Sequence, residues 1–219
     1  MNEPQRVARK AGRPAAGAAD LPTDRQIIDR GLAAFAELGY DGASVRDLGR
    51  RLGVSHNFIN DRYGSKESFW KFVVDGAQTT MRSMIAEVLA AQYSDELERM
   101  RDVLRTFHQM SLSEPNLARI MQHEATIGGD RLDYVFTKYL APVREAVAPL
   151  VARLIAEGRV RPIPLEIMVF AIVAMNQVSS AGPLVQLLGD GFASDPQGYV
   201  GALSNILLAG LESPPTDCR

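Results

Sequence analysis

From Leu21 onward, apolar residues recur at three- and four-residue intervals, and no stretch alternates apolar with polar residues. The first spacing places apolar side chains on one face of a helix, whereas alternation is typical of a strand. The sequence therefore predicts an all-α protein. Glycine, proline and helix-capping residues divide the pattern into separate elements. We expect helices over residues 23–38, 45–52, 56–63, 66–91, 95–112, 115–127, 131–157, 165–188 and 196–211.

Two of these helices carry signals of an end or an irregularity. Thr23 and Gln26 have the spacing of a capping box at the start of the first helix, and Gly39 stands where a glycine commonly ends one. Pro142 and Pro149 lie inside the seventh predicted helix. Because each proline removes an N–H donor and crowds the preceding turn, we expect a kink there, or a break near Pro142.

Charge is distributed unevenly along the chain. The 219 residues carry 24 Lys/Arg and 26 Asp/Glu, a net charge of −2. Twelve basic and nine acidic residues fall within residues 1–72, which gives that part a charge of +3 and leaves −5 for the rest. A basic segment on an acidic remainder suggests a module that binds a polyanion, joined to a module with another task.

Composition indicates a soluble, cytoplasmic protein. The one cysteine, Cys218, lies near the last residue, so we expect no internal disulfide. No apolar run approaches the roughly 20 residues that span a bilayer, and we expect no secretory signal. We divide the chain into a disordered basic arm (1–20), a small helical domain (21–70), a larger helical domain (71–212) and a tail (213–219).

Residues 44–63 have the pattern of a helix-turn-helix, two short predicted helices joined by a Gly-Val-Ser turn. Gly49 would allow the two helices to approach closely, and Gly53 can adopt the positive φ that the turn requires. A small core would come from Val45, Leu48, Leu52, Val54, Ile59 and Tyr63. The second helix of such a motif presents its N-terminal turn to the major groove of DNA. An ordinary helical hairpin is the alternative.

Several anchors in and around this motif follow one another in a fixed order. They are Leu32, Phe35, Leu38-Gly39-Tyr40, Ser44-Val45-Arg46-Asp47-Leu48, Gly53-Val54-Ser55 and Arg62-Tyr63-Gly64-Ser65-Lys66-Glu67. Over about residues 23–72 the chain thereby resembles the DNA-binding domain of the tetracycline-repressor (TetR) family. The resemblance implies a homodimeric transcriptional repressor that binds a palindromic operator in double-stranded DNA. It also implies that the larger domain dimerises and holds a small-molecule effector.

Carried over position by position, the resemblance implies DNA contacts along both helices of the motif and at the start of the next. The positions are Ser44, Val45, Arg46, Ser55, His56, Asn57, Phe58, Asn60, Arg62, Tyr63 and Lys66. The cations of this set would neutralise phosphates, and its imidazole and amide groups would read base edges. Asn60 stands where the family commonly has Tyr, and Phe58 replaces a small residue and is assigned mainly to core packing. The basic segment 9–13 enters a minor groove or remains a solvated tail.

The larger domain is rich in methionine and aromatic residues. We take as candidates for an effector pocket Phe107, His108, Met110, Met121, Glu124, Phe136, Tyr139 and Asn176. Pockets for small molecules are mostly apolar with a few converging polar groups, and this set has that composition. Core packing is the alternative for each residue, and a hydrogen bond across a subunit interface is a further alternative for Asn176.

The helices predicted over 165–188 and 196–211 have broad apolar faces and are our candidates for the dimer interface. The apolar residues are Ile167, Val169, Phe170, Ile172, Val173, Leu203, Ile206, Leu207 and Leu211. A helix that is apolar nearly all round is buried on more than one side. The resemblance implies a four-helix bundle of two such pairs about a twofold axis, and burial within one chain is the alternative.

Catalytic chemistry has little support in the sequence. There is no Walker or Rossmann glycine pattern, and His108 and His123 lie on different predicted helices without the spacing of a zinc site. We expect no enzyme activity, no cofactor and no metal ion. Two rival functions stay open: a TetR-like regulator that is constitutive or controlled by a protein partner, and a helical binding or catalytic protein with a vestigial DNA-binding head.

Overall fold

The computed structural model describes residues 21–175, 187, 189 and 191–213. These residues are helical apart from turns and one antiparallel bridge between Val160 and Glu212. The helices are α1 (Asp24–Gly42), α2 (Val45–Leu52), α3 (Phe58–Tyr63), α4 (Lys66–Ala90), α5 (Glu96–Ser113), α6 (Pro115–Ile127), α7 (Asp130–Val135), the π-helical η1 (Phe136–Leu140), α8 (Ala141–Ala156), α9 (Leu165–Met175), α12 (Gly191–Ser194) and α13 (Pro196–Leu211). The predicted all-α fold is confirmed. No helix within the described ranges is both long and apolar enough to cross a bilayer.

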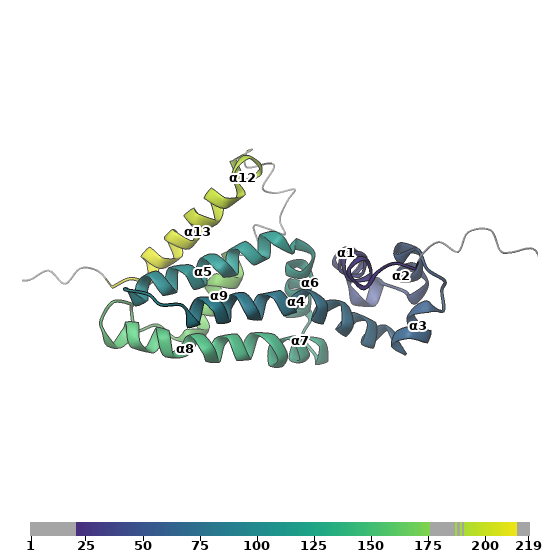
Figure 1. The fold of residues 1–219 in the computed structure, drawn as a ribbon, viewed down its shortest axis with the longest axis horizontal. Helices are drawn as coiled ribbons and strands as arrows, with labels where there is room; N and C mark the ends of the chain where they lie inside the picture. The colour runs from purple at the N-terminus through teal and green to yellow at the C-terminus, as the bar shows by residue number, and fades with distance from the viewer. Residues whose placement is uncertain (1–20, 176–186, 188, 190, 214–219) are drawn as a thin grey trace, which may run out of the picture.

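Helices α1, α2 and α3 form a small head at one end of the molecule (Figure 1). The capping box at the start of α1 is present, because the Thr23 hydroxyl accepts from the Gln26 N–H and the Gln26 side chain accepts from the Thr23 N–H. Gly39, at φ 69°, interrupts α1 before a last turn that ends at Gly42. Gly39, predicted to end the first helix, therefore kinks it, and one more helical turn follows.

Helix α4 runs from the head into a larger helical body, where it packs between α5 and α8 (Figure 1). Its first half closes the head, since Phe69, Trp70 and Val73 are fully buried there. Its second half contributes Ile85 to a separate core that it shares with α5, α8, α9 and α13. One continuous helix thus belongs to both parts.

The core of the head continues into the body. Leu117 and Ile120 of α6, with Val135 of α7 and Tyr139 of η1, lie in the same buried cluster as the apolar residues of α1–α3. Because apolar burial is the main favourable term in folding, the head is docked against α6 and α7 and does not hang from α4 alone. The two predicted domains therefore share an apolar boundary.

Three predicted helices differ from the observed ones in instructive ways. Helix α3 begins at Phe58, two residues later than expected. The segment 131–157 is divided by η1 directly before Pro142, and its wider i→i+5 turns absorb the proline without a break. The helix predicted over 165–188 is described as α9 to Met175, and most of its remainder lies outside the described residues, as do the predicted arm (1–20) and most of the tail.

Candidate DNA-binding surface

The turn between α2 and α3 has the geometry that the two glycines predict. Gly53 adopts φ 74°, and its N–H donates to the carbonyls of Arg50 and Gly49. A Cβ on Gly49 would lie 3.2 Å from the Ser55 carbonyl oxygen, so only glycine allows this approach without displacing backbone. The Ser44 hydroxyl accepts from the Asp47 N–H at 3.1 Å and begins α2. These local features fix α3 against α2.

Helix α3 turns one face into the core and leaves the other in solvent. Ile59 is fully buried, and Phe58 and Tyr63 pack against the same apolar cluster. The opposite side presents His56, Asn57 and Asn60, all exposed. A six-residue helix held by one buried face therefore offers its first turn, and the turn before it, to a partner.

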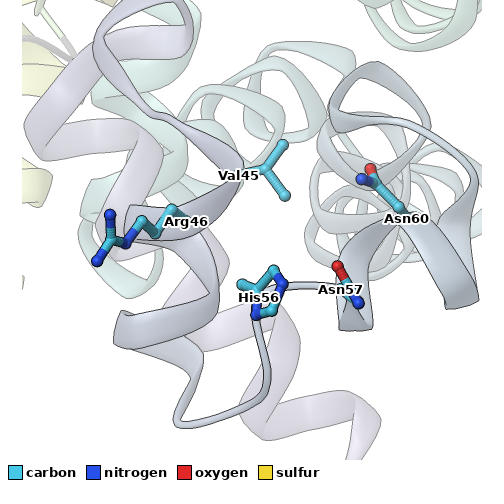
Figure 2. Close-up of a pocket in the computed structure, with 5 residues that line it drawn as sticks. All are labelled: Val45, Arg46, His56, Asn57 and Asn60. Atoms are coloured by element: carbon cyan, nitrogen blue, oxygen red, sulfur yellow. The ribbon is translucent and has the colours of Figure 1, made fainter.

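An open depression lies between the start of α2 and the start of α3. It is lined by Val45, Arg46, His56, Asn57 and Asn60 (Figure 2). In Figure 2 the side chains of Val45 and Arg46 come from α2 and those of the other three from α3 and the turn before it. Imidazole and amide groups both donate and accept hydrogen bonds, as readout of base edges requires. Five of the eleven predicted DNA contacts are thus brought together.

The other predicted contacts lie in two settings. Ser44, Ser55 and Arg62 are exposed in the head, whereas Phe58, Tyr63 and Lys66 are half-buried. The Tyr63 hydroxyl is buried and has no hydrogen-bond partner among the described residues, and burial raises its pKa. Tyr63 instead packs against Phe69 and Phe72 in tilted ring contacts, with ring centroids 5.0 and 4.9 Å away. Its placement is that of a core residue beneath the surface.

Lys66 is also engaged within the protein. Its ammonium donates to the backbone carbonyls of Tyr40 and Ala43, at 3.0 and 3.1 Å, and lies 4.2 Å from the centre of the Tyr40 ring. An ammonium has three N–H donors, so this cation is largely satisfied without DNA. Lys66 thereby stabilises the connection between α1 and α2, directly before the helix cap at Ser44.

Ion pairs neutralise most of the remaining positive charge of the head. Arg62 pairs with Asp24 of α1 at 2.7 Å, and other carboxylates hold Arg50 and Arg51 on α2. Arg46 is different: within residues 21–71 as described, it is the one Lys or Arg without an ion pair or a side-chain hydrogen bond. The sequence does not predict the pairing of Arg62 with Asp24, because Asp24 resembles any acidic residue in the first turn of a helix.

Among the described residues, the candidate effector residues lie in different settings. Met121 and Tyr139 belong to the core that the head shares, Phe107 packs against the second core, and Phe136 is exposed. Met110 is half-buried, and Asn176 lies outside the described residues. The buried Glu124 pairs with Arg131.

Two buried polar groups of the body have incomplete hydrogen bonding. His108 Nδ1 lies 2.8 Å from the Ser204 hydroxyl, whereas its Nε2 has no partner in the described part of the chain. Burial lowers the pKa of His108, which favours the neutral ring. Gln78 of α4 is 1% exposed, and its Oε1 has no partner among the same residues. The sequence does not predict the burial of Gln78, because a single glutamine on a long helix usually faces solvent.

Comparison with known proteins agrees with this geometry. Residues 27–71 match the model of bacterial regulatory proteins of the tetR family. Residues 27–71 therefore have the sequence pattern of a tetR-family DNA-binding domain. An uncharacterized HTH-type transcriptional regulator, YezE of Bacillus subtilis (strain 168), is 29% identical over 79 residues, which are 36% of this chain and 40% of YezE. The sequence match to YezE therefore spans less than half of either chain.

Solved structures resemble the chain over most of its length. The ketosteroid transcriptional regulator KstR2 of Mycobacterium tuberculosis aligns with a TM-score of 0.68 and 19% identity, over 87% of this chain and 95% of KstR2. A transcriptional regulator from Rhodococcus sp. Rha1 aligns with a TM-score of 0.63 and 16% identity, over 87% and 96%. At these identities the likeness establishes a shared fold for the body as well as for the TetR-type head.

Proposed function

We propose that this chain is a cytoplasmic one-component transcriptional regulator, most simply a repressor, whose head binds operator DNA through α2 and α3. The observation that carries the proposal is the exposed set of Arg46, His56, Asn57 and Asn60 on a helix-turn-helix of the tetR family. Their groups match what a major groove offers, because amides pair with adenine edges and a guanidinium pairs with phosphate or guanine.

A homodimer is the second part of the proposal, and the exposed apolar side chains of the body support it. Ile167 and Phe170 on α9 are 55% and 77% exposed, and Ile206 on α13 is 63% exposed. Large apolar side chains left open on neighbouring helices are typical of an interface. A twofold dimer would carry two heads and select a palindromic operator whose half-sites lie about 34 Å apart, one turn of DNA.

Control by a small, largely apolar effector is the third part of the proposal. Gln78 buries an amide oxygen that accepts a hydrogen bond and has no donor among the described residues, and the neutral His108 buries an Nε2 with no partner there, which accepts in one tautomer of the ring and donates in the other. Burying such atoms unpaired costs free energy. An effector that brings a hydroxyl or N–H group to either atom would recover that cost, while its apolar part would pack among the methionine and aromatic side chains of the body.

Selection of DNA from a randomised duplex pool by the wild-type protein tests the core of the proposal. Enrichment of a palindrome supports it, and failure to enrich any sequence at low salt would contradict it. Asn60→Ala should change which bases are enriched, because it removes a base-reading amide. Arg62→Ala should weaken all sequences alike, because it removes the ion pair with Asp24 that holds α3 against α1. Arg153→Ala is the matched control for Arg62, since Arg153 also pairs with a carboxylate but lies on α8.

A further inference from the structure

Arg131 of α7 connects the body to the end of α1. Its guanidinium lies 4.0 Å from the centre of the Tyr40 ring, and its Nε donates to the Glu124 carboxylate at 3.0 Å. The Glu124 side chain is 2% exposed and that of Arg131 19% exposed. A cation that is largely removed from water interacts strongly with an aromatic face and with a carboxylate. Arg131 is therefore held from α6 and presses on α1.

The contact continues from Tyr40 to the DNA-facing surface. Lys66 lies over the same Tyr40 ring and donates to the carbonyls of Tyr40 and Ala43. Ala43 immediately precedes Ser44, the cap of α2 and the first residue of the surface. Beside Tyr40, the Trp70 ring is packed edge-on at 6.4 Å. A displacement of Arg131 would thus change contacts that lie within a few residues of Val45 and Arg46.

A second set of contacts ties the same part of the body to α4. Asp75 accepts hydrogen bonds from the Tyr134 hydroxyl at 2.8 Å, from the Lys138 ammonium at 2.6 Å and from the Tyr139 hydroxyl. Burial raises the pKa of Asp75, but the bonds from Lys138, Tyr139 and Tyr134 together outweigh it and leave the pKa below its usual value. The carboxylate therefore stays charged and holds α4 against α7 and η1.

The segment that bears these contacts has an irregular backbone at both ends. Gly128 and Gly129 precede α7 with φ 78° and 89°, and η1 follows it. Residues with positive φ end a helix sharply, and π-helical turns are often found at functional positions. Six residues of regular helix are thus set between a two-glycine turn and a π-helical turn. Such a unit can shift without remodelling α6 or α8.

We propose that α7 and η1 together form a strut that sets the position of the head, through Arg131 on Tyr40 and through Tyr134, Lys138 and Tyr139 on Asp75. Regulation of DNA binding then consists of engaging or releasing this strut. The inference rests on the proposed DNA-binding function and adds the residues that connect the body to the head. Such a connection is demonstrated only if a substitution at one end changes the behaviour of the residues at the other end.

Hydrogen exchange of the free full-length protein tests the first half of the proposal. Arg131→Gln removes the charge over Tyr40, so exchange of residues 40–48 should become about tenfold faster while that of α8 is unchanged. Tyr40→Leu, which keeps the Arg131–Glu124 pair, should give the same result and guards against a folding defect from an unpaired Glu124. Arg153→Gln, on a salt bridge remote from the head, should have no effect. Unchanged exchange at residues 40–48 in both variants would overturn the proposal.

The second half of the proposal, that the strut responds to DNA binding, is tested with the duplex enriched by the wild-type protein. Binding of this duplex should slow exchange across residues 130–140 in the wild type, although α7 makes no predicted DNA contact. In Tyr40→Leu and Arg131→Gln this protection should vanish, and affinity should fall about tenfold. DNA bound normally by the wild type with no response at 130–140 would refute the strut and leave the proposed function standing. Failure to enrich any duplex would instead refute the proposed function, and the strut with it.

Discussion

Arg46 offers the sharpest test of how the head attracts DNA. Its neighbours Arg50 and Arg51 on α2 are held by carboxylates, Arg51 by two hydrogen bonds to Glu37 at 2.7 and 2.8 Å. A cation that is already paired must lose its partner before it neutralises a phosphate, so it releases fewer counterions on binding. Arg46→Ala should therefore reduce the salt dependence of DNA binding, whereas Arg51→Ala should leave it nearly unchanged.

The magnitude follows from the number of phosphates neutralised. Each such contact contributes about 0.9 to the slope of log affinity against log salt, so two Arg46 side chains in a dimer contribute about 1.8. Between 50 and 200 mM salt, a fourfold range, the affinity defect of Arg46→Ala should then shrink by about twelvefold. Fluorescence anisotropy of a labelled duplex at several salt concentrations measures this directly.

Two outcomes would refute the reasoning about Arg46. Equal slope changes for Arg46→Ala and Arg51→Ala would mean that ion pairs in the free head do not decide which cations reach phosphates. A defect in Arg46→Ala that is the same at every salt concentration would assign this side chain to base contact and not to phosphate. Circular dichroism of both variants should show the helix content of the wild type.

Three further predictions concern the fold and the assembly. Gly49→Ala gains about 1 kcal/mol of helix propensity but pushes a methyl group against the backbone of the following turn, at a cost of about 1–3 kcal/mol, so thermal unfolding should show a net loss of stability. Phe170→Glu should convert the proposed dimer to a monomer in light scattering, whereas Ile127→Glu, also an exposed apolar position, should not. Hydrogen bonds from Arg159 and from a backbone N–H lower the pKa of Asp95 to about 2. The stability from this pair is therefore complete above about pH 4 and is lost as pH falls towards 2, and Arg159→Gln should flatten the fall of Tm in that window.

The fold could be predicted from the sequence where local signals decide it. Thr23 caps α1 as expected, Gly53 makes the left-handed turn, and Ile59 anchors α3 in the core. These features depend on residues close together in the chain. The prolines predict a kink, or a break near Pro142, but no local pattern predicts the π-helical segment η1, whose Lys138 bonds to Asp75 of α4.

The candidate site was predictable in its residue types but not in its pairings. Asn60 faces solvent on α3, whose buried residue is Ile59, and His56 and Asn57 face solvent from the turn before it. The engagement of Arg62 by Asp24 spans 38 positions and depends on how α1 crosses α3. Long-range pairs of this kind are set by tertiary packing. The sequence therefore predicts more cations free to bind phosphates than the structure has.

The ion pairs of the head and the strut at α7 lead to one physical expectation. A head with few unpaired cations gains little from nonspecific attraction, so its affinity must come from base contacts and from two heads docking at once. Simultaneous docking depends steeply on geometry, because the second head binds in an intramolecular step that is lost when the spacing is wrong. If the proposed strut operates, we therefore expect a small movement of Arg131 against Tyr40 to suffice to release DNA, whereas a head rich in free arginines would stay bound through charge alone.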